Sequence, residues 1–243
     1  MKYIIFDVDD TLYDQTQGFK RAYALLFSEK YAYAQIDPEI LCLHSRRHSD
    51  TVFEAMRTGK ITQEESGRYR ITMAMRDFQV EISEQEAGDF QKVYSRCQEE
   101  VTLESDVEEM LSELSGQKVG LAVITNGEGP HQRAKMKSLG LERWIVREYC
   151  FVSGDTPYAK PQTELFRIVE EKLGVKPEDE IWFIGDSYAS DVVGARKAGW
   201  NAVWFNRRNH KAPQSEYLPD YTVKNVEELR NLLNTLIKQG GEG

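Results

Sequence analysis

Three acidic residues directly follow an apolar run near the start of the chain. The stretch YIIFDVDDTLYD, residues 3–14, carries Asp7, Asp9 and Asp10 where its apolar run ends. Carboxylates this close together repel one another and lose hydration, so their clustering indicates that a cation lies among them. We therefore expect this segment to take part in chemistry on a charged group.

Three further segments place polar residues where an apolar run ends. The run AVITNG stops at Thr125 and Asn126, and the segment YAKPQTELF carries Lys160 directly before a proline. In WFIGDSYASDVVGARKAG, Asp186 ends the run and Asp191 follows five positions later. Because parallel strands end at one edge of a sheet, all four segments are able to meet there.

The elements that position these residues alternate between strand and helix. We expect strands at 3–8, 118–125, 148–153, 180–186, 201–206 and 221–223, and helices at 105–115, 130–138, 161–173, 189–198 and 226–237. Strands that alternate with helices indicate a parallel sheet covered on both faces. The predicted fold class is therefore α/β, a Rossmann-like three-layer core with a parallel sheet. The last residues, KQGGEG, have the composition of a disordered tail.

Residues 15–100 show a different pattern, with apolar residues at helical spacing and no convincing strand. We expect about four helices here, inserted between the first strand and the rest of the core. The predicted domains are a core of residues 1–14 and 101–243 and an all-helical cap of residues 15–100. An insert that follows the carboxyl end of a strand lies over the ligand crevice, which makes it a candidate lid.

Composition and charge limit the classes of function. The chain has 243 residues, with 31 Lys and Arg against 40 Asp and Glu, and a formal charge of −9. This balance opposes general binding to nucleic acid or to anionic lipid surfaces. No apolar run approaches the roughly 18 residues of a membrane-spanning helix. The cysteines, Cys42, Cys97 and Cys150, form no CxxC pair, which indicates neither a disulfide framework nor a zinc site and favours a cytoplasmic protein.

Together the four polar segments resemble the motifs of the haloacid dehalogenase superfamily of phosphohydrolases. That family has a DxDxT after its first strand, a Thr or Ser after its second, a lone Lys and a GDxxxxD, and this chain has all four in order. The resemblance covers residues 3–14 and 101–206. The helical insert is similar to the family's cap between motifs one and two, but its sequence matches far less specifically.

The resemblance implies a Mg²⁺-dependent enzyme that acts through an aspartyl phosphate. Asp7 would be the nucleophile and, together with Asp186, a ligand of Mg²⁺. Asp9 would give the metal its backbone carbonyl, and its side chain would protonate the leaving oxygen and later accept a proton from water. We expect the Asp9 carboxyl, shielded from solvent and near a like charge, to hold that proton at neutral pH.

The other motif residues would act on the phosphoryl group or support those that do. Thr125 and the backbone amide of Asn126 would bind the transferring group, and Lys160 would add positive charge to it. Asp191 would hold Lys160 or a water on the metal in place.

Several other polar and aromatic residues are weighed separately. We assign turn and capping roles to Asp10 and Asp14. Aromatic residues of the insert are more often core than substrate platform, and among them Phe19 and Tyr23 have the best chance of lining the pocket. Basic residues are kept outside the site, as a solvated helix face or a loop: His44, Arg46, Arg47 and His48 in the insert, and Arg207, Arg208 and His210 after a core strand.

The favoured function is a phosphatase for a small soluble phosphate ester, a nucleotide or a sugar phosphate, because a helical cap indicates a closed pocket. A phosphomutase is the alternative, since it uses the same aspartyl phosphate and differs in keeping water away. A dehalogenase is disfavoured because it needs neither the metal nor the second acid of the first motif. A non-catalytic binding protein on this scaffold would be free to lose an acid, and none is lost. We expect a small phosphorylated metabolite as partner, with no nucleic acid polymer and no membrane.

Overall fold

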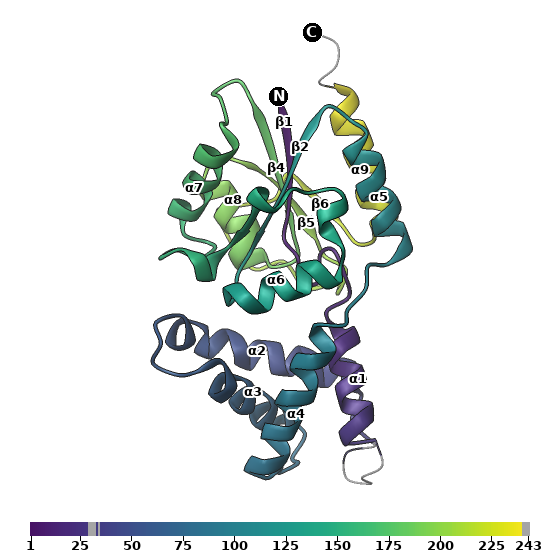
Figure 1. The fold of residues 1–243 in the computed structure, drawn as a ribbon, viewed down its shortest axis with the longest axis vertical. Coiled ribbons are helices and arrows are strands. Elements are labelled where there is room, and N and C mark those ends of the chain that lie inside the picture. Colours follow the sequence, from purple (N-terminus) through teal and green to yellow (C-terminus); the bar gives the residue numbers. More distant parts are fainter. Residues whose placement is uncertain (29–32, 34, 240–243) are drawn as a thin grey trace. The chain divides into compact units, whose positions relative to one another are not determined.

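The computed structural model describes residues 1–28, 33 and 35–239 (Figure 1). The chain divides into two compact units, a core of Met1–Asp14 and Thr102–Gly243 and an insert of Gln15–Val101. The chain therefore returns to the core after Val101 rather than after Glu100. Of the expected disordered tail, residues 240–243 lie outside the described residues, whereas Lys238 and Gln239 end a helix. Within the described part of the chain, no helix is long and apolar enough to cross a bilayer.

The core contains one six-stranded sheet, and every hydrogen-bonded pair of strands in it is parallel. The strand order is β3-β2-β1-β4-β5-β6, so β1 lies in the middle and β4 begins the half built in the opposite direction. The crevice at such a reversal lies outside the carboxyl ends of the strands beside it, here β1 and β4. The strands are β1 Lys2–Phe6, β2 Val119–Thr125, β3 Cys150–Val152, β4 Glu180–Gly185, β5 Asn201–Phe205 and β6 Tyr221–Val223.

Helices cover both faces of this sheet, which confirms the predicted α/β class. In Figure 1, α7 and α8 lie side by side on one face, and α5 and α9 lie side by side on the other. Because side chains alternate along a strand, Tyr3 and Ile5 of β1 pack in one cluster with Phe166 and Val169 of α7. The core helices are α5 Ser105–Ser115, α6 Gly129–Ser138, α7 Thr163–Leu173, α8 Val193–Lys197 and α9 Val226–Gln239.

Two core elements differ from the sequence prediction. The strand expected at 148–153 is reduced to Cys150–Val152, because a short helical turn, η2 Arg147–Tyr149, precedes it. The helix expected at 189–198 begins instead as a π-helical turn, η4 Tyr188–Val192, before α8. Further short turns are η1 Leu141–Arg143 and η3 Ser153–Asp155.

The insert consists of α1 Thr16–Leu26, α2 Pro38–Arg57, α3 Gln63–Asp77 and α4 Glu84–Gln98. Capping boxes begin two of these helices, formed by Thr62 with Glu65 and by Ser83 with Glu86. Aromatic rings fill the interior of this unit; those of Phe27 and Phe90, for example, are stacked with centroids 5.3 Å apart.

Two sequence interpretations in the insert need correction. Phe19 and Tyr23, given the best chance of lining a pocket, are 1% and 5% exposed and belong to the core of the insert. His44 and His48 do not lie on a fully solvated face, because both imidazoles contact Asp77 Oδ2, at 2.6 and 2.9 Å. That carboxylate comes from α3, and the i, i+4 spacing on α2 brings both rings to it.

Candidate active site

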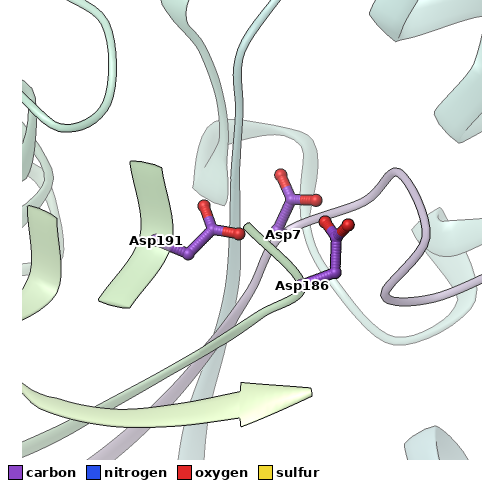
Figure 2. Close-up of side chains that lie close together, drawn as sticks. All are labelled: Asp7, Asp186 and Asp191. Carbon is purple, nitrogen blue, oxygen red and sulfur yellow. The ribbon is translucent and has the colours of Figure 1, made fainter. Parts of the chain in front are cut away.

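Three carboxylates lie side by side at the carboxyl ends of β1 and β4 (Figure 2). Asp7 directly follows β1, and its amide still donates to Ile184 O of β4 at 2.8 Å. Asp186 follows β4, and Asp191 comes from the π-helical turn. One carboxylate oxygen from each of Asp7, Asp186 and Asp191 lies within 4.8 Å of the other two. Asp7 and Asp191 are buried, and Asp186 is half-buried.

A glycine allows Asp191 to fold back over the end of β4. A Cβ atom on Gly185 would lie only 2.2 Å from Asp191 Oδ2, so no other residue type fits there without displacing the carboxylate. The same Oδ2 accepts a hydrogen bond from the Ser187 amide at 2.9 Å. The glycine of the GDxxxxD segment is therefore explained by close approach of the second aspartate.

Lys160 connects two of these carboxylates. Its Nζ lies 2.6 Å from Asp7 Oδ1 and 2.7 Å from Asp191 Oδ1, and it also donates to Ile124 O at 3.0 Å. The Asn126 amide holds the Lys160 backbone in place, since its Nδ2 donates to Lys160 O at 3.0 Å and its Oδ1 accepts from Lys160 N at 2.9 Å. The Asn126 side chain thus positions Lys160, a task that the sequence did not reveal.

Thr125, the last residue of β2, brings a hydroxyl to the same edge of the sheet. The residue is buried, and its Oγ1 makes no hydrogen bond to any described residue. A buried hydroxyl without a partner costs about 1–3 kcal/mol. It is a donor of the kind that an anionic ligand oxygen would use.

Asp9 points into a different environment, made by the first turns of α6. Its Oδ1 accepts from Lys135 Nζ at 2.6 Å and from the Tyr13 hydroxyl at 2.5 Å, and its Oδ2 accepts from Gln132 Nε2 at 2.9 Å. Sequence reasoning missed Lys135 and Gln132. Their i, i+3 spacing directly after the Thr125 segment was the available signal, but polar residues on a helix are usually solvated.

The surroundings shift the pKa values of these groups in opposite directions. Burial raises the pKa of Asp7 well above its usual range; Lys160 opposes this rise, and the acids Asp191 and Asp186 add to it. Burial also opposes the charge on Asp9, but Lys135 and the three hydrogen bonds outweigh burial and lower its pKa. The expectation that a neighbouring like charge keeps a proton on Asp9 is therefore wrong for this structure, because a buried ammonium contacts its carboxylate.

Two adjacent arginines bind the segments on either side of the insert. Arg208 donates to both carboxylate oxygens of Asp10, at 2.8 and 3.1 Å, and also pairs with Asp14. Arg207 Nη2 donates to both oxygens of Glu104, at 2.8 and 3.0 Å. Asp10 does adopt the positive φ of a turn residue, 61°. The sequence assignment of Asp10 and Asp14 to turns and caps nevertheless omitted their ion pairs with Arg208.

The donor set fits a hard divalent cation. Carboxylate oxygens are the ligands that Mg²⁺ prefers, and within the described residues Asp7, Asp186 and Asp191 form the acidic group with suitable spacing. Asp191 already contacts Lys160 and the Ser187 amide. A cation here would also supply positive charge to Asp7, whose burial disfavours ionisation.

Comparison with known proteins connects this geometry to a family. The model of the haloacid dehalogenase-like hydrolases matches residues 4–205. The chain is 28% identical to the HAD-hydrolase YfnB of Bacillus subtilis, over 95% of this chain and 94% of that protein. It is 29% identical to N-acylneuraminate-9-phosphatase of Rattus norvegicus, over 96% of this chain and 94% of that protein.

Solved structures show the same fold. The crystal structure of YfnB bound to magnesium matches with a TM-score of 0.72 and 27% identity, over 96% of this chain and 100% of that one. The L-2-haloacid dehalogenase of Xanthobacter autotrophicus matches with a TM-score of 0.70, over 96% and 98% of the two chains. Its identity of 19% shows a shared fold alone.

Proposed function

The chain belongs to the haloacid dehalogenase-like hydrolase family, and from that premise we propose that it is a cytoplasmic, Mg²⁺-dependent phosphatase of small phosphate monoesters. The observation that carries this proposal is the buried Asp7 carboxylate, which lies against the Lys160 ammonium and beside Asp186 and Asp191. The three cysteines, all within the described part of the chain, form no disulfide, which suits a reducing compartment.

Asp7 is the proposed nucleophile. A phosphate monoester is an anion that carboxylates repel, so positive charge has to accompany attack. Lys160 Nζ already supplies such a charge 2.6 Å from Asp7 Oδ1. Asp7, Asp186 and the Asp9 backbone carbonyl would hold Mg²⁺, which would supply further positive charge to the site. Attack by Asp7 on phosphorus gives an aspartyl phosphate and releases the alcohol.

The phosphoryl group is bound by donors at the end of β2. The unpartnered Thr125 hydroxyl and the Asn126 backbone amide donate to its oxygens, and Lys160 offsets their charge. Asp9 protonates the leaving oxygen and then accepts a proton from the water that hydrolyses the aspartyl phosphate. Although burial opposes the charge, Lys135 and the hydrogen bonds lower the pKa of Asp9, so the structure corresponds to the carboxylate that accepts a proton from water. Binding of the anionic ester beside Asp9 would raise the pKa of this carboxyl and so favour uptake of the proton that Asp9 gives to the leaving oxygen.

The comparisons support phosphate chemistry over its alternatives. A relative that this chain matches over 96% of its length is named as a phosphatase, whereas a relative named as a haloacid dehalogenase matches, at 31% identity, over only 55% of this chain. We propose a phosphorylated sugar, sugar acid or nucleotide as substrate. A phosphomutase would use the same carboxylates, so only the fate of the phosphoryl group separates it from a phosphatase.

A substrate panel tests the proposal. Purified protein would be given N-acylneuraminate 9-phosphate, hexose phosphates, nucleoside monophosphates and phosphoserine, with inorganic phosphate measured in Mg²⁺ and in EDTA. We expect phosphate release from at least one ester in Mg²⁺ and none in EDTA. Phosphoryl transfer to a sugar without phosphate release would indicate a mutase. Halide release from a 2-haloacid, with no phosphate release, would overturn the proposal.

A further inference from the structure

The Asp9 carboxylate is held by a polar group of side chains that no motif of the chain includes. Lys135 and Gln132 come from α6 and Tyr13 from the loop after β1, and together they contact both carboxylate oxygens. We propose that Lys135, assisted by Gln132 and Tyr13, is a positioning residue that fixes the orientation in which Asp9 serves the leaving group. This inference rests on the proposed phosphatase function.

The contacts leave the carboxylate little freedom. Oδ1 accepts from Lys135 at 2.6 Å and from Tyr13 at 2.5 Å, while Oδ2 accepts from Gln132 at 2.9 Å. Rotation about the side chain of Asp9 would break at least one of these bonds. Proton transfer depends on donor and acceptor geometry, so a fixed carboxylate is worth more to catalysis than a mobile one.

Burying the polar side chains of Lys135 and Gln132 on α6 does not favour folding by itself. The Lys135 side chain is only 2% exposed, and burying an ammonium is costly unless it is paired. Gln132 Nε2 donates both to Asp9 and to Asn126 O at 2.7 Å, whereas the buried Gln132 Oε1 has no hydrogen-bond partner in the described part of the chain. An apolar face on α6 would avoid both penalties. The buried polar side chains of α6 are therefore explained by the hydrogen bonds with which they fix the Asp9 carboxylate.

The consequence is a selective effect on substrates. An ester of an alkyl alcohol needs a proton on its leaving oxygen, whereas 2,4-dinitrophenyl phosphate leaves as a stable phenolate without one. Positioned proton transfer contributes about 10²–10⁴-fold to a rate. A residue that orients Asp9 should therefore matter for alkyl esters and hardly for the dinitrophenyl ester, and the difference is read in kcat/KM, which includes the bond-breaking step.

The test compares Lys135→Met with wild type on both ester classes, and Lys137→Met on the exposed face of the same helix is the matched control. We expect Lys135→Met to lose about tenfold or more in kcat/KM on alkyl phosphates and less than about threefold on the dinitrophenyl ester. Tyr13→Phe removes one hydroxyl at a buried position and should show the same selectivity to a smaller degree. If Lys135→Met does not fold, the selectivity of Tyr13→Phe between the two ester classes tests the proposal instead.

A crystal structure of Lys135→Met gives a readout independent of activity. We expect its Asp9 carboxylate to leave the position beside Gln132. Equal losses on both ester classes, or an unmoved Asp9, would overturn the inference while the phosphatase proposal stands. If wild type hydrolyses no phosphate ester, the proposed function fails, and the catalytic part of the inference fails with it. A displaced Asp9 would then support only the orienting contact.

Discussion

At the residue scale, Thr125 allows the requirements of folding and of the proposed catalysis to be tested separately. Its hydroxyl is buried and has no hydrogen-bond partner among the residues that the structure describes, so removing it breaks no described hydrogen bond. We predict that Thr125→Val unfolds at a urea midpoint no lower than that of wild type, because a buried unsatisfied hydroxyl is removed, while kcat/KM for phosphate esters falls by about 10²-fold because a donor to the phosphoryl group is lost. Thr11→Val is the stability control, since its hydroxyl is also buried and without a partner among the described residues. Unchanged activity in Thr125→Val would remove Thr125 from the site.

Asp7 is required for the proposed activity, but its burial is unfavourable for the stability of the folded protein. A carboxyl whose folded pKa is raised binds its proton more tightly in the folded than in the unfolded state. Stability is therefore lost as pH rises from the unfolded pKa toward the folded one, so Asp7 makes the metal-free protein less stable at neutral pH than at a pH below the unfolded pKa. We predict that Asp7→Asn abolishes hydrolysis yet melts no lower than wild type in EDTA. A lower melting temperature would show that its contact with Lys160 outweighs burial.

At the scale of elements, Arg208 ties the loop after β5 to the loop after β1. Asp10 is 0% exposed, so removing the guanidinium leaves a buried carboxylate without this partner. We predict that Arg208→Met lowers the free energy of unfolding by about 3 kcal/mol in urea titration, because breaking a buried pair from one side is costly. Adding Asp10→Asn should recover part of the loss.

Arg230→Met is the matched control for this prediction. Arg230 pairs with Glu113 between two core helices, but both side chains are partly accessible to solvent, with exposed fractions of 34% and 42%. Exposed pairs contribute little, so we expect a much smaller change than at Arg208. Equal losses in the two variants would mean that burial does not set the strength of the Arg208 pair.

The elements also explain which parts of the site were predictable. Asp7, Thr125 and Asp186 each end an apolar strand, and a parallel sheet gathers strand ends, so local pattern was enough to place them. Lys135 lies on a helix whose buried face is polar, and a period of 3.6 residues cannot reveal that a lysine points inward. The π-helical turn before α8 was equally hidden, because it depends on Asp191 packing over Gly185. A contact between distant segments, Lys135 with Asp9, accounts for the first, and close packing within one short segment, Asp191 over Gly185, accompanies the second.

At the scale of the whole molecule, the core has its own hydrophobic interior. The cluster that contains Ile5, Phe166 and Phe183 draws all its residues from the core unit. We predict that replacing residues 15–101 with a short Gly-Ser linker leaves a protein that unfolds cooperatively, measured by circular dichroism during urea titration. A variant that is unfolded or shows no cooperative transition would mean that the core depends on the insert.

The ion pairs of Arg207 and Arg208 bear on how the insert can be exchanged during evolution. Arg208 binds Asp14, the last residue before the insert, and Arg207 binds Glu104, shortly after it. Because consecutive Cα atoms are only about 3.8 Å apart, the core residues that flank the insert both pair with one short segment of the core. Recombination can therefore exchange the stretch between them as a single cassette. If the insert selects the substrate, a lineage gains new substrates by that route while the aspartates at the strand ends of the core are inherited unaltered.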